Sequence, residues 1–409
     1  MLNQHKAYYW LIVLTAYAAG AFLILNAWEG VNLSWEASTP NYPIHNLHLS
    51  YGNSKPPARV VKGLYLTAYS AGNPAKIDEI INLIDKTELN AVVIDIKDYS
   101  GLIFYPSQVP LVVKINASEN RLRDIVATIK KLHDHNIYVI ARQTVFQDPF
   151  LAEARPEWAI KSKSGGSVSA TATPDKLWRD NKGLTWVDPT RKEVWNYNLA
   201  IAREAAELGF DEINFDYVRF PSDGPMSQVV YSDTRKLYEI MGEFYKFIGA
   251  GMKGAPVWIS LDMFGFVMEK SGEDDMRIGQ RVVDAVNFTD YISPMMYPSH
   301  YPSGHLNLKN PAAFPGAVID NGMKMGEHFF TTSTRAQVRP WLQAFNMGAI
   351  YDAEKIRAQI DMVEKYPNAG WLLWNASNRY SDAGLTVCHP DAPERSDKYS
   401  WGENRGLCP

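Results

Sequence analysis

The stretch "GFDEINFDYVRFPSDG", residues 209–224, alternates like a β-strand but ends in a carboxylate. Asn214 and Asp216 fall on one face of this strand, and Ile213 and Phe215 fall on the other. An unpaired buried charge is strongly unfavourable, so the chain must pair Asp216 or present it in an open site. Asp262 ends a second apolar run, "PVWISLDMF". Two carboxylates that meet at one substrate can divide the roles of acid and nucleophile.

The segments that would position these carboxylates repeat along the chain. From residue 59, short apolar runs alternate with longer amphipathic runs, which predicts strands joined by helices. Eight strand–helix repeats predict an α/β fold of the (β/α)8 TIM-barrel type over residues 59–385. A doubly wound sheet is not expected, because "YLTAYSAGNPAKI" lacks the glycine-rich dinucleotide pattern. The predicted strands span 60–68, 90–98, 136–146, 211–218, 256–264, 290–298, 338–345 and 370–377, and the predicted helices span 75–88, 119–135, 191–208, 233–250, 275–287 and 353–366.

Polar residues collect late in these strands, on one parity. In a closed parallel barrel, alternate residues face the interior, and active sites lie at the carboxyl ends of the strands. Polar side chains at the same height on several strands therefore predict one shared site. They are Asp95, Lys97, Arg142, Asn214, Asp216, Ser260, Asp262, Tyr297 and Gln343.

Five segments then carry a resemblance to a known family. The segments are "VIDIKDYSG", "LTWVDPTRKEVWNY", "FDEINFDYVRFPSDG", "ISPMMYPSHY" and "WLLWNASNRY". In this order they resemble a bacterial family of candidate glycoside hydrolases related to α-amylase-like TIM barrels, over about residues 59 to 380. The piece "FDYVRFP" is the most specific. The resemblance implies a barrel that hydrolyses glycosidic bonds.

The resemblance also implies roles for the two aspartates. In α-amylase-like barrels, the nucleophile ends strand four and the acid/base ends strand five, which places Asp216 as nucleophile and Asp262 as acid/base. This sequence departs from the pattern at Asp262, where the family relatives usually carry the longer Glu. The alternative for each aspartate is a salt bridge, with Arg142 or Arg219, that only closes the barrel mouth.

Other polar and aromatic residues near the strand ends are candidates for substrate binding. Arg142 would hold Asp216 ionised, because an adjacent guanidinium favours the charged carboxylate. Asp98 would bind sugar hydroxyls or serve as a second candidate acid, whereas Asp95 and Lys97 are expected to form a buried ion pair. Tyr297 and Trp374 would offer stacking platforms. The full candidate set is Asp98, Arg142, Asn214, Arg219, Tyr297, Gln343, Trp374 and Asn375.

Composition and charge limit the classes of molecule that this chain is expected to bind. The formal net charge is −4 and no basic stripe is present, so no nucleic-acid partner is expected. The nine His residues form no pair inside a predicted strand, so neither a metal nor a cofactor is expected. The 12 Trp and 22 Tyr residues provide flat rings that suit sugar faces, which favours a poly- or oligosaccharide partner.

The N-terminal segment predicts export. Residues 7–28, "AYYWLIVLTAYAAGAFLILNAW", carry no charge and are long enough to cross a hydrocarbon core of about 30 Å. They favour an uncleaved signal anchor in the membrane. A cleaved signal peptide is the alternative, with small residues at 16–20. Either reading places the catalytic domain in the periplasm or outside the cell, after a linker over residues 29–58.

The tail over residues 386–409 contains both cysteines of the chain, Cys388 and Cys408. An exported protein with only this pair favours a disulfide, which would close the polar tail into a loop.

Two insertions, 147–188 and 299–322, are expected on the catalytic face, where they would extend a groove for a polymer. Two other functions stay open. One is a non-catalytic, membrane-tethered barrel that binds glycans, which would need the aromatic residues but not a converging carboxylate pair. The other is a polysaccharide-modifying partner within an envelope assembly.

Overall fold

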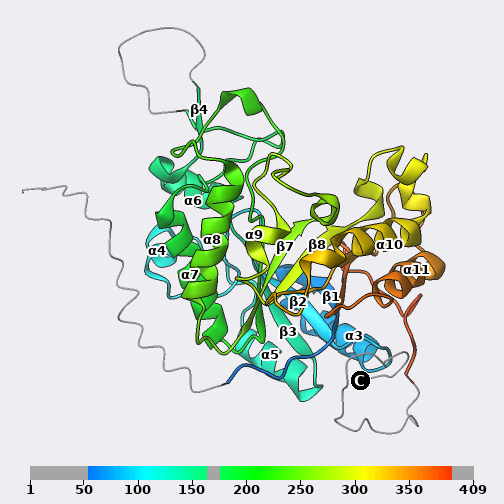
Figure 1. Cartoon of the computed structure of the whole chain (residues 1–409). Coiled ribbons are helices and arrows are strands. Elements are labelled where there is room, and N and C mark those ends of the chain that lie inside the picture. Colours follow the sequence, from blue (N-terminus) through cyan, green and yellow to red (C-terminus); the bar gives the residue numbers. More distant parts are fainter. Residues whose placement is uncertain (1–53, 164–175, 389–409) are drawn as a thin grey trace, which may run out of the picture. The chain divides into compact units, whose positions relative to one another are not determined.

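The computed structural model describes residues 54–163 and 176–388. Eight parallel strand positions close into a barrel with helices packed around it, so the predicted TIM-barrel fold is confirmed (Figure 1). All eight predicted strands are present. The barrel strands are β1 (Val61–Leu66), β2 (Ala91–Lys97), β3 (Tyr138–Thr144), β5 (Glu212–Asp216), β7 (Trp258–Phe264), β8 (Tyr291–Met296), the pair β9 (Gln337–Val338) and β10 (Trp341–Gln343), and β11 (Gly370–Trp374).

The barrel closes through a broken seventh strand. β8 pairs with β9 at its start and with β10 at its end, and β10 pairs in turn with β11, which pairs with β1. Pro340 lies between β9 and β10 and has no N–H to donate to a neighbouring strand. The break therefore falls where the sequence cannot continue the hydrogen-bonded ladder.

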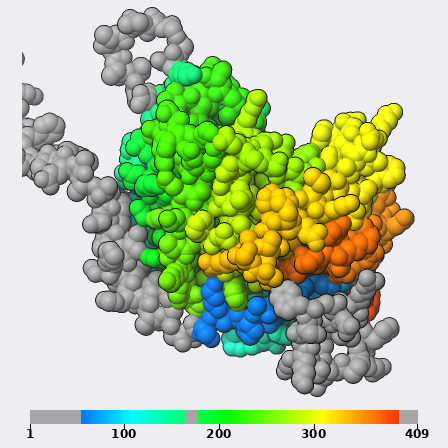
Figure 2. Space-filling model, viewed as in Figure 1, coloured from blue at the N-terminus to red at the C-terminus, as the bar shows by residue number. Residues whose placement is uncertain are grey.

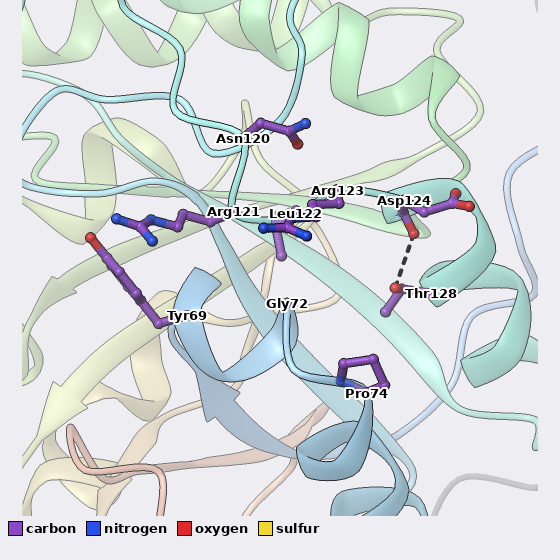
Figure 3. A pocket seen from close by; sticks show the side chains of 9 residues that line it. All are labelled: Tyr69, Gly72, Pro74, Asn120, Arg121, Leu122, Arg123, Asp124 and Thr128. Carbon is purple, nitrogen blue, oxygen red and sulfur yellow. Dashed lines mark hydrogen bonds between the residues drawn. The ribbon is translucent and has the colours of Figure 1, made fainter.

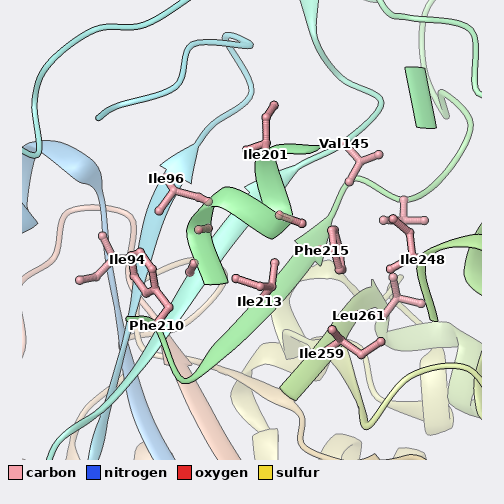
Figure 4. Close-up of a cluster of buried hydrophobic side chains, with 14 of the residues drawn as sticks. Ile94, Ile96, Val145, Ile201, Phe210, Ile213, Phe215, Ile248, Ile259 and Leu261 are labelled. Carbon is pink, nitrogen blue, oxygen red and sulfur yellow. The ribbon is translucent and has the colours of Figure 1, made fainter. Parts of the chain in front are cut away.

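Two separate hydrophobic cores lie on the two faces of the sheet. The inner core includes Val61, Tyr65, Val93, Ile140 and Trp341, all directed into the barrel. The outer core fills the space between sheet and helices. Figure 4 shows part of it, with Ile213 and Phe215 of β5 directed away from the barrel axis toward Ile201 and Ile248 of the helices. The alternation predicted for this strand is therefore correct, and Asn214 and Asp216 belong to the interior.

Helices follow seven of the eight strand positions within the described residues. Four of the six predicted helices match observed ones closely, at α3, α7, α8 and α11, and the predicted helix 119–135 is shortened to α5. The helices are α2 (Ala68–Ala71), α3 (Pro74–Ile84), α4 (Pro110–Ile115), α5 (Ile125–Asp134), α6 (Pro149–Ala154), α7 (Lys192–Glu207), α8 (Leu237–Gly251), α9 (Val282–Ala285), α10 (Pro315–Gly326) and α11 (Ala353–Val363).

Two predictions about helices are wrong in extent. The helix predicted over 275–287 is reduced to the single turn α9, because Met276, Arg277 and Gly279 have positive φ angles of 55°, 59° and 81°. In contrast, the predicted insertion 299–322 includes the first part of a helix, α10, which begins at Pro315.

A buried ion pair closes the barrel at the end where β5 starts, opposite the carboxyl ends of the strands. Arg339 pairs with Glu212 at the start of β5, and both side chains are fully buried. Tyr138 donates a hydrogen bond to Glu212 at 3.1 Å. Glu212 is therefore structural, as its place at the start of the strand indicates.

The loops at the carboxyl ends of the strands are long. The loop after β3 contains α6 and the short strand β4 (Lys161–Ser162), which pairs antiparallel with β6 (Val229–Val230) of the loop after β5. The loop after β8 carries the short 3-10 turns η5 (Pro298–His300), η6 (His305–Asn307) and η7 (Pro311–Ala313). Figure 2 shows the surface hollowed between the green part and the yellow part, which includes the loop after β8.

Three predictions concern residues that the structure does not describe. The anchor 7–28 and most of the linker 29–58 lie outside the described ranges, as does Cys408, so the disulfide stays a prediction. Among the helices within residues 54–163 and 176–388, none is long and apolar enough to cross a membrane.

Candidate active site

Asp216 ends β5 inside the barrel mouth. One carboxylate oxygen, Oδ1, accepts a hydrogen bond from the backbone N–H of Tyr217 at 2.5 Å, and Oδ2 forms an ion pair with Arg142. Tyr217 has a φ of +52°, so the backbone turns out of the strand directly after the carboxylate. The side chain of Asp216 is buried. The strand thus ends in a carboxylate that is paired at once, by a guanidinium from the neighbouring strand β3.

Asp262 lies on the adjacent strand β7 with the same orientation. Its Oδ1 accepts two hydrogen bonds of 2.8 Å, from the Asn214 side-chain amide and from the indole N–H of Trp341. Its Oδ2 lies 3.8 Å from Nε of Arg142. Both carboxylates therefore contact the same guanidinium group, which brings the two predicted catalytic residues together.

The two carboxylates differ in their surroundings. Burial and the neighbouring charge of Asp216 raise the pKa of Asp262 to about 8, although Arg142 and the two hydrogen bonds oppose the rise. Asp262 is thus mainly protonated at neutral pH. Because Oδ1 already accepts two hydrogen bonds, the proton belongs on Oδ2. Asp216 instead forms an ion pair with Arg142, and two carboxylates in such different surroundings can supply a proton and a nucleophile at one site.

Arg142 is held in place from its other side. Its Nη1 donates to Asp95 at 2.5 Å, and the Tyr65 hydroxyl donates to the other oxygen of Asp95 at 2.5 Å. Burial raises the pKa of the Asp95 carboxyl, and the adjacent guanidinium of Arg142 lowers it. A buried chain of contacts thus runs from Tyr65 through Asp95 and Arg142 to Asp216.

The predicted ion pair between Asp95 and Lys97 is wrong. Lys97 Nζ lies 2.9 Å from Asp148 and donates to the carbonyl oxygen of Thr144 at 2.6 Å. The register of β2 against β3 shifts between Asp95 and Lys97, so the two residues do not share a face. Asp95 is left to pair with Arg142.

The comparisons with known proteins bear on this barrel. A family model described as "Putative glycosyl hydrolase domain" (DUF4015) matches residues 63–380. The chain belongs to this family. Membership of this family of glycosyl hydrolase domains supports a glycan-processing function. A search of curated proteins found no match.

The chain is similar to several solved structures, and one of them, with a TM-score of 0.52, shares its fold. The glycoside hydrolase domain of PgaB (BpsB) from Bordetella bronchiseptica is 13% identical, with a TM-score of 0.52, and the match covers 78% of this chain and 95% of that one. A hypothetical protein from Ruminiclostridium thermocellum is 39% identical over 49% of this chain and 96% of its own, with a TM-score of 0.42. An α-galactosidase from Thermus thermophilus is 10% identical over 79% of this chain and 60% of its own, with a TM-score of 0.47.

Two predicted platforms of the glycoside hydrolase domain lie beside the carboxylates. Trp374 stacks on Tyr65 with ring centroids 3.8 Å apart, and its other contacts include the Arg142 guanidinium, 5.1 Å from the ring centroid. Tyr297 is buried, and burial together with the charges of Asp262 and Asp216 raises the pKa of its hydroxyl. Both rings therefore border the site, and their role in stacking against sugar stays a prediction.

Three other candidates use their polar groups within the protein. The Gln343 amide accepts from Ser299 N–H at 3.1 Å and donates to the Phe345 carbonyl at 3.0 Å. Asn375 donates to the carbonyl oxygen of Ala344, directly after β10, and to that of Arg379 in its own loop. Asp98 accepts from Ser100 within its own loop. Direct contact of these three with substrate stays a prediction.

Two residues of the site were not among the predicted ones. Trp341 bonds Asp262, and Tyr65 bonds Asp95. A signal for each was present in the sequence, because Trp341 has the same parity as Gln343 on the seventh strand, and Tyr65 is the last aromatic of the first strand. The signal is weak, because an aromatic residue in a strand is usually part of the hydrophobic core.

The pocket in Figure 3 belongs to a different part of the glycoside hydrolase domain. It has a volume of about 400 Å³ and lies between α2, the start of α3 and the segment before α5, where Arg121 packs over the ring of Tyr69. None of its lining residues belongs to the carboxylate site. Within the described residues, no group of three or more His, Cys, Asp or Glu side chains could hold a metal ion.

Proposed function

We propose that the chain hydrolyses glycosidic bonds of a poly- or oligosaccharide with Asp216 as nucleophile and Asp262 as acid/base. One observation carries the proposal. Two buried carboxylates on adjacent strands share the guanidinium of Arg142, and their environments make one a proton donor and leave the other ionised. Glycoside hydrolysis requires such a pair, one on each side of the scissile bond.

The steps follow from these positions. Asp262 gives its Oδ2 proton to the glycosidic oxygen as the bond to the anomeric carbon breaks, while Asp216 attacks that carbon and forms a covalent glycosyl ester. Water then attacks the ester, Asp262 takes a proton from the water, and Asp216 leaves as a carboxylate. Arg142 stays near the reacting groups throughout, because Asp95 holds its Nη1 and compensates its charge when Asp216 is esterified.

A non-catalytic glycan-binding barrel is the second candidate, and one observation favours it. Asp216 is in an ion pair with Arg142, which would also be found if the aspartate only closed the barrel mouth. In that case the site would bind sugar through Trp374 and Tyr297 without bond cleavage.

A cleavage assay separates the two candidates. The purified full-length chain is incubated with α- and β-linked glycans, including amino-sugar polymers, and new reducing ends are counted. We expect release of reducing ends from at least one glycan, and loss of this release in the double variant Asp216→Ala, Asp262→Ala. Binding of a glycan without any release by the wild type would establish the binding barrel instead.

The raised pKa of Asp262 predicts a pH dependence. Asp262 acts as an acid only while protonated, so kcat/KM should be retained below pH 8 and fall as the pH rises through about 8. The Trp341 N–H stabilises the charged form of Asp262. Its removal in Trp341→Phe should therefore raise the pKa and move the basic limb to higher pH.

The matched control is Trp195→Phe, because Trp195 is equally buried but donates to the carbonyl oxygen of Pro189. Its pH–rate profile should keep the wild-type limb. A limb that stays fixed in Trp341→Phe, or moves equally in both variants, would show that Asp262 does not set it.

We also propose that the domain lies outside the cytoplasm, anchored by residues 7–28, because this uncharged apolar run has the length of a membrane span. Protease added to spheroplasts should then degrade the domain, and complete protection would refute export.

Non-reducing mass spectrometry of the exported protein should find Cys388 joined to Cys408; two free thiols would refute the bridge.

A further inference from the structure

Arg219 differs from the other buried arginines in its partners. Arg142, Arg219 and Arg339 are the buried arginines of the described ranges, and their side chains are at most 8% exposed. Arg142 and Arg339 form ion pairs with aspartate or glutamate. Among the described residues, no carboxylate lies within 4.0 Å of the Arg219 guanidinium. Its charge is compensated only by the more distant carboxylates of Asp216, Asp223 and Asp180, so the lack of a direct ion pair calls for an explanation.

Most of the hydrogen-bonding capacity of Arg219 is unused. Nη1 donates to the Phe220 carbonyl at 3.1 Å and to the Ser222 hydroxyl at 3.3 Å. Nε and Nη2 have no hydrogen-bond partner in the part of the chain that the structure describes, although a guanidinium has five N–H donors. Burial lowers the pKa of Arg219, but the group remains a cation at any physiological pH.

Aromatic rings fix the position of this guanidinium. It lies 5.1 Å from the ring centroids of Trp186 and Tyr217, and 4.9 Å from that of Phe264. Tyr217 directly follows Asp216, and Phe264 ends β7 two residues after Asp262. Arg219 is therefore placed beside the ends of the two strands that carry the carboxylate pair, and the charge of Asp216 acts on it.

We propose that Arg219 binds an anionic group on the substrate, so that the natural substrate is an acidic glycan. The inference rests on the proposed function, because it takes the carboxylate pair as the place where the sugar binds. A carboxylate, sulfate or phosphate oxygen would accept hydrogen bonds from Nε and Nη2 in the paired geometry that guanidinium groups favour. Such a group would form the direct ion pair that none of these carboxylates makes with Arg219.

The test compares acidic glycans with their neutral counterparts. The full-length chain is assayed for binding by calorimetry and for reducing-end release. The probes are polygalacturonate, hyaluronan and alginate, each beside its carboxyl-reduced form, and heparan sulfate and a glycerol-phosphate glycan, each beside its desulfated or dephosphorylated form. The wild type should prefer one acidic member over its neutral counterpart by about 10- to 100-fold, as expected for hydrogen bonds to charged groups. Which probe shows the preference identifies the anion.

The variants test whether Arg219 causes the preference. In Arg219→Met the acidic-to-neutral ratio should fall to about one, and Arg219→Lys should keep part of it. The control Arg235→Met removes an arginine that is exposed and paired with Glu243, and should keep the wild-type ratio. A structural role for Arg219 would lower both members of a pair equally and leave the ratio unchanged, which would overturn the proposal.

The outcomes for the two proposals differ. Cleavage of neutral and acidic members at equal rates by the wild type would refute the acidic-glycan inference and leave the hydrolase intact. Acidic preference in calorimetry that depends on Arg219, without release of reducing ends from any probe, would support the inference and refute the hydrolase.

Discussion

The variant Asp216→Ala is expected to have a kcat at least about a thousand-fold lower than that of the wild type on every substrate. Without the nucleophile, no covalent intermediate can form. The loss should not depend on the leaving group. Arg142 keeps its contacts with Asp95 and Asp262 in this variant, so two of its three carboxylate partners remain and the fold should persist. The measurement is the release of reducing ends, with circular dichroism as the check on folding.

Chemical rescue tests the role more sharply. The side chain removed in Asp216→Ala leaves room for a small anion beside Arg142, so azide should restore part of the turnover and yield a glycosyl azide. The matched control is Asp98→Ala, because the Asp98 carboxylate bonds Ser100 within its own loop. If Asp98→Ala abolishes activity while Asp216→Ala and Asp262→Ala stay within a few-fold of the wild type, the second strand carries the chemistry and the pair has been misassigned.

The sequence alone was sufficient to predict the barrel fold and to predict that Asp216 and Asp262 lie close together. Both depend on the period of two along a strand, which places Asn214, Asp216 and Asp262 in the interior without any knowledge of partners. The structure confirms this placement, since Asn214 bonds Asp262 directly from the adjacent strand.

Predictions based on strict alternation failed at Lys97. A bulge adds one residue to a strand, so every later side chain changes face. The shift in register between Asp95 and Lys97 separates the two residues that parity alone would place together. Nothing in "VIDIKD" distinguishes a bulged strand from a regular one, because the bulge is set by pairing with β3.

Helix α10 was not predicted from the sequence, because its segment contains several glycines. A Cβ added at Gly322 would lie 2.3 Å from the methyl carbon of Met296, and one added at Gly326 would lie 2.2 Å from that of Met268. The two glycines let α10 lie close to these methionine side chains, although glycine lowers helix propensity. The segment therefore looks like a loop in the sequence, and tertiary contacts that the sequence does not display make it a helix.

The sequence predicts that Arg142 faces the barrel interior, but it does not predict which carboxylates Arg142 contacts. Its contacts with Asp95, Asp216 and Asp262 come from three strands far apart in the sequence. Parity brings these residues to one height, but it does not decide which carboxylate takes the shortest contact. The raised pKa of Asp262 depends first on its burial, which parity does not give either.

Asp262→Ala is expected to behave differently from Asp216→Ala. An acid matters most when the leaving group is poor, so natural glycans should lose about 100- to 10,000-fold in kcat/KM, while aryl glycosides with acidic phenols should lose much less. The basic limb near pH 8 should disappear from the pH–rate profile, because the group that sets it is gone. The readout is kcat/KM on a series of aryl glycosides with phenols of increasing pKa.

The slope of that series distinguishes an acid from a structural carboxylate. Without Asp262, the rate should depend more steeply on the phenol pKa than it does in the wild type, since the leaving oxygen must depart unprotonated. Asp262→Asn is the matched variant, because an amide oxygen can still accept the hydrogen bonds from Asn214 and Trp341 that Oδ1 accepts in the wild type. If the two variants lose the same activity on good and poor leaving groups alike, Asp262 only positions its neighbours, and the proton must come from another group.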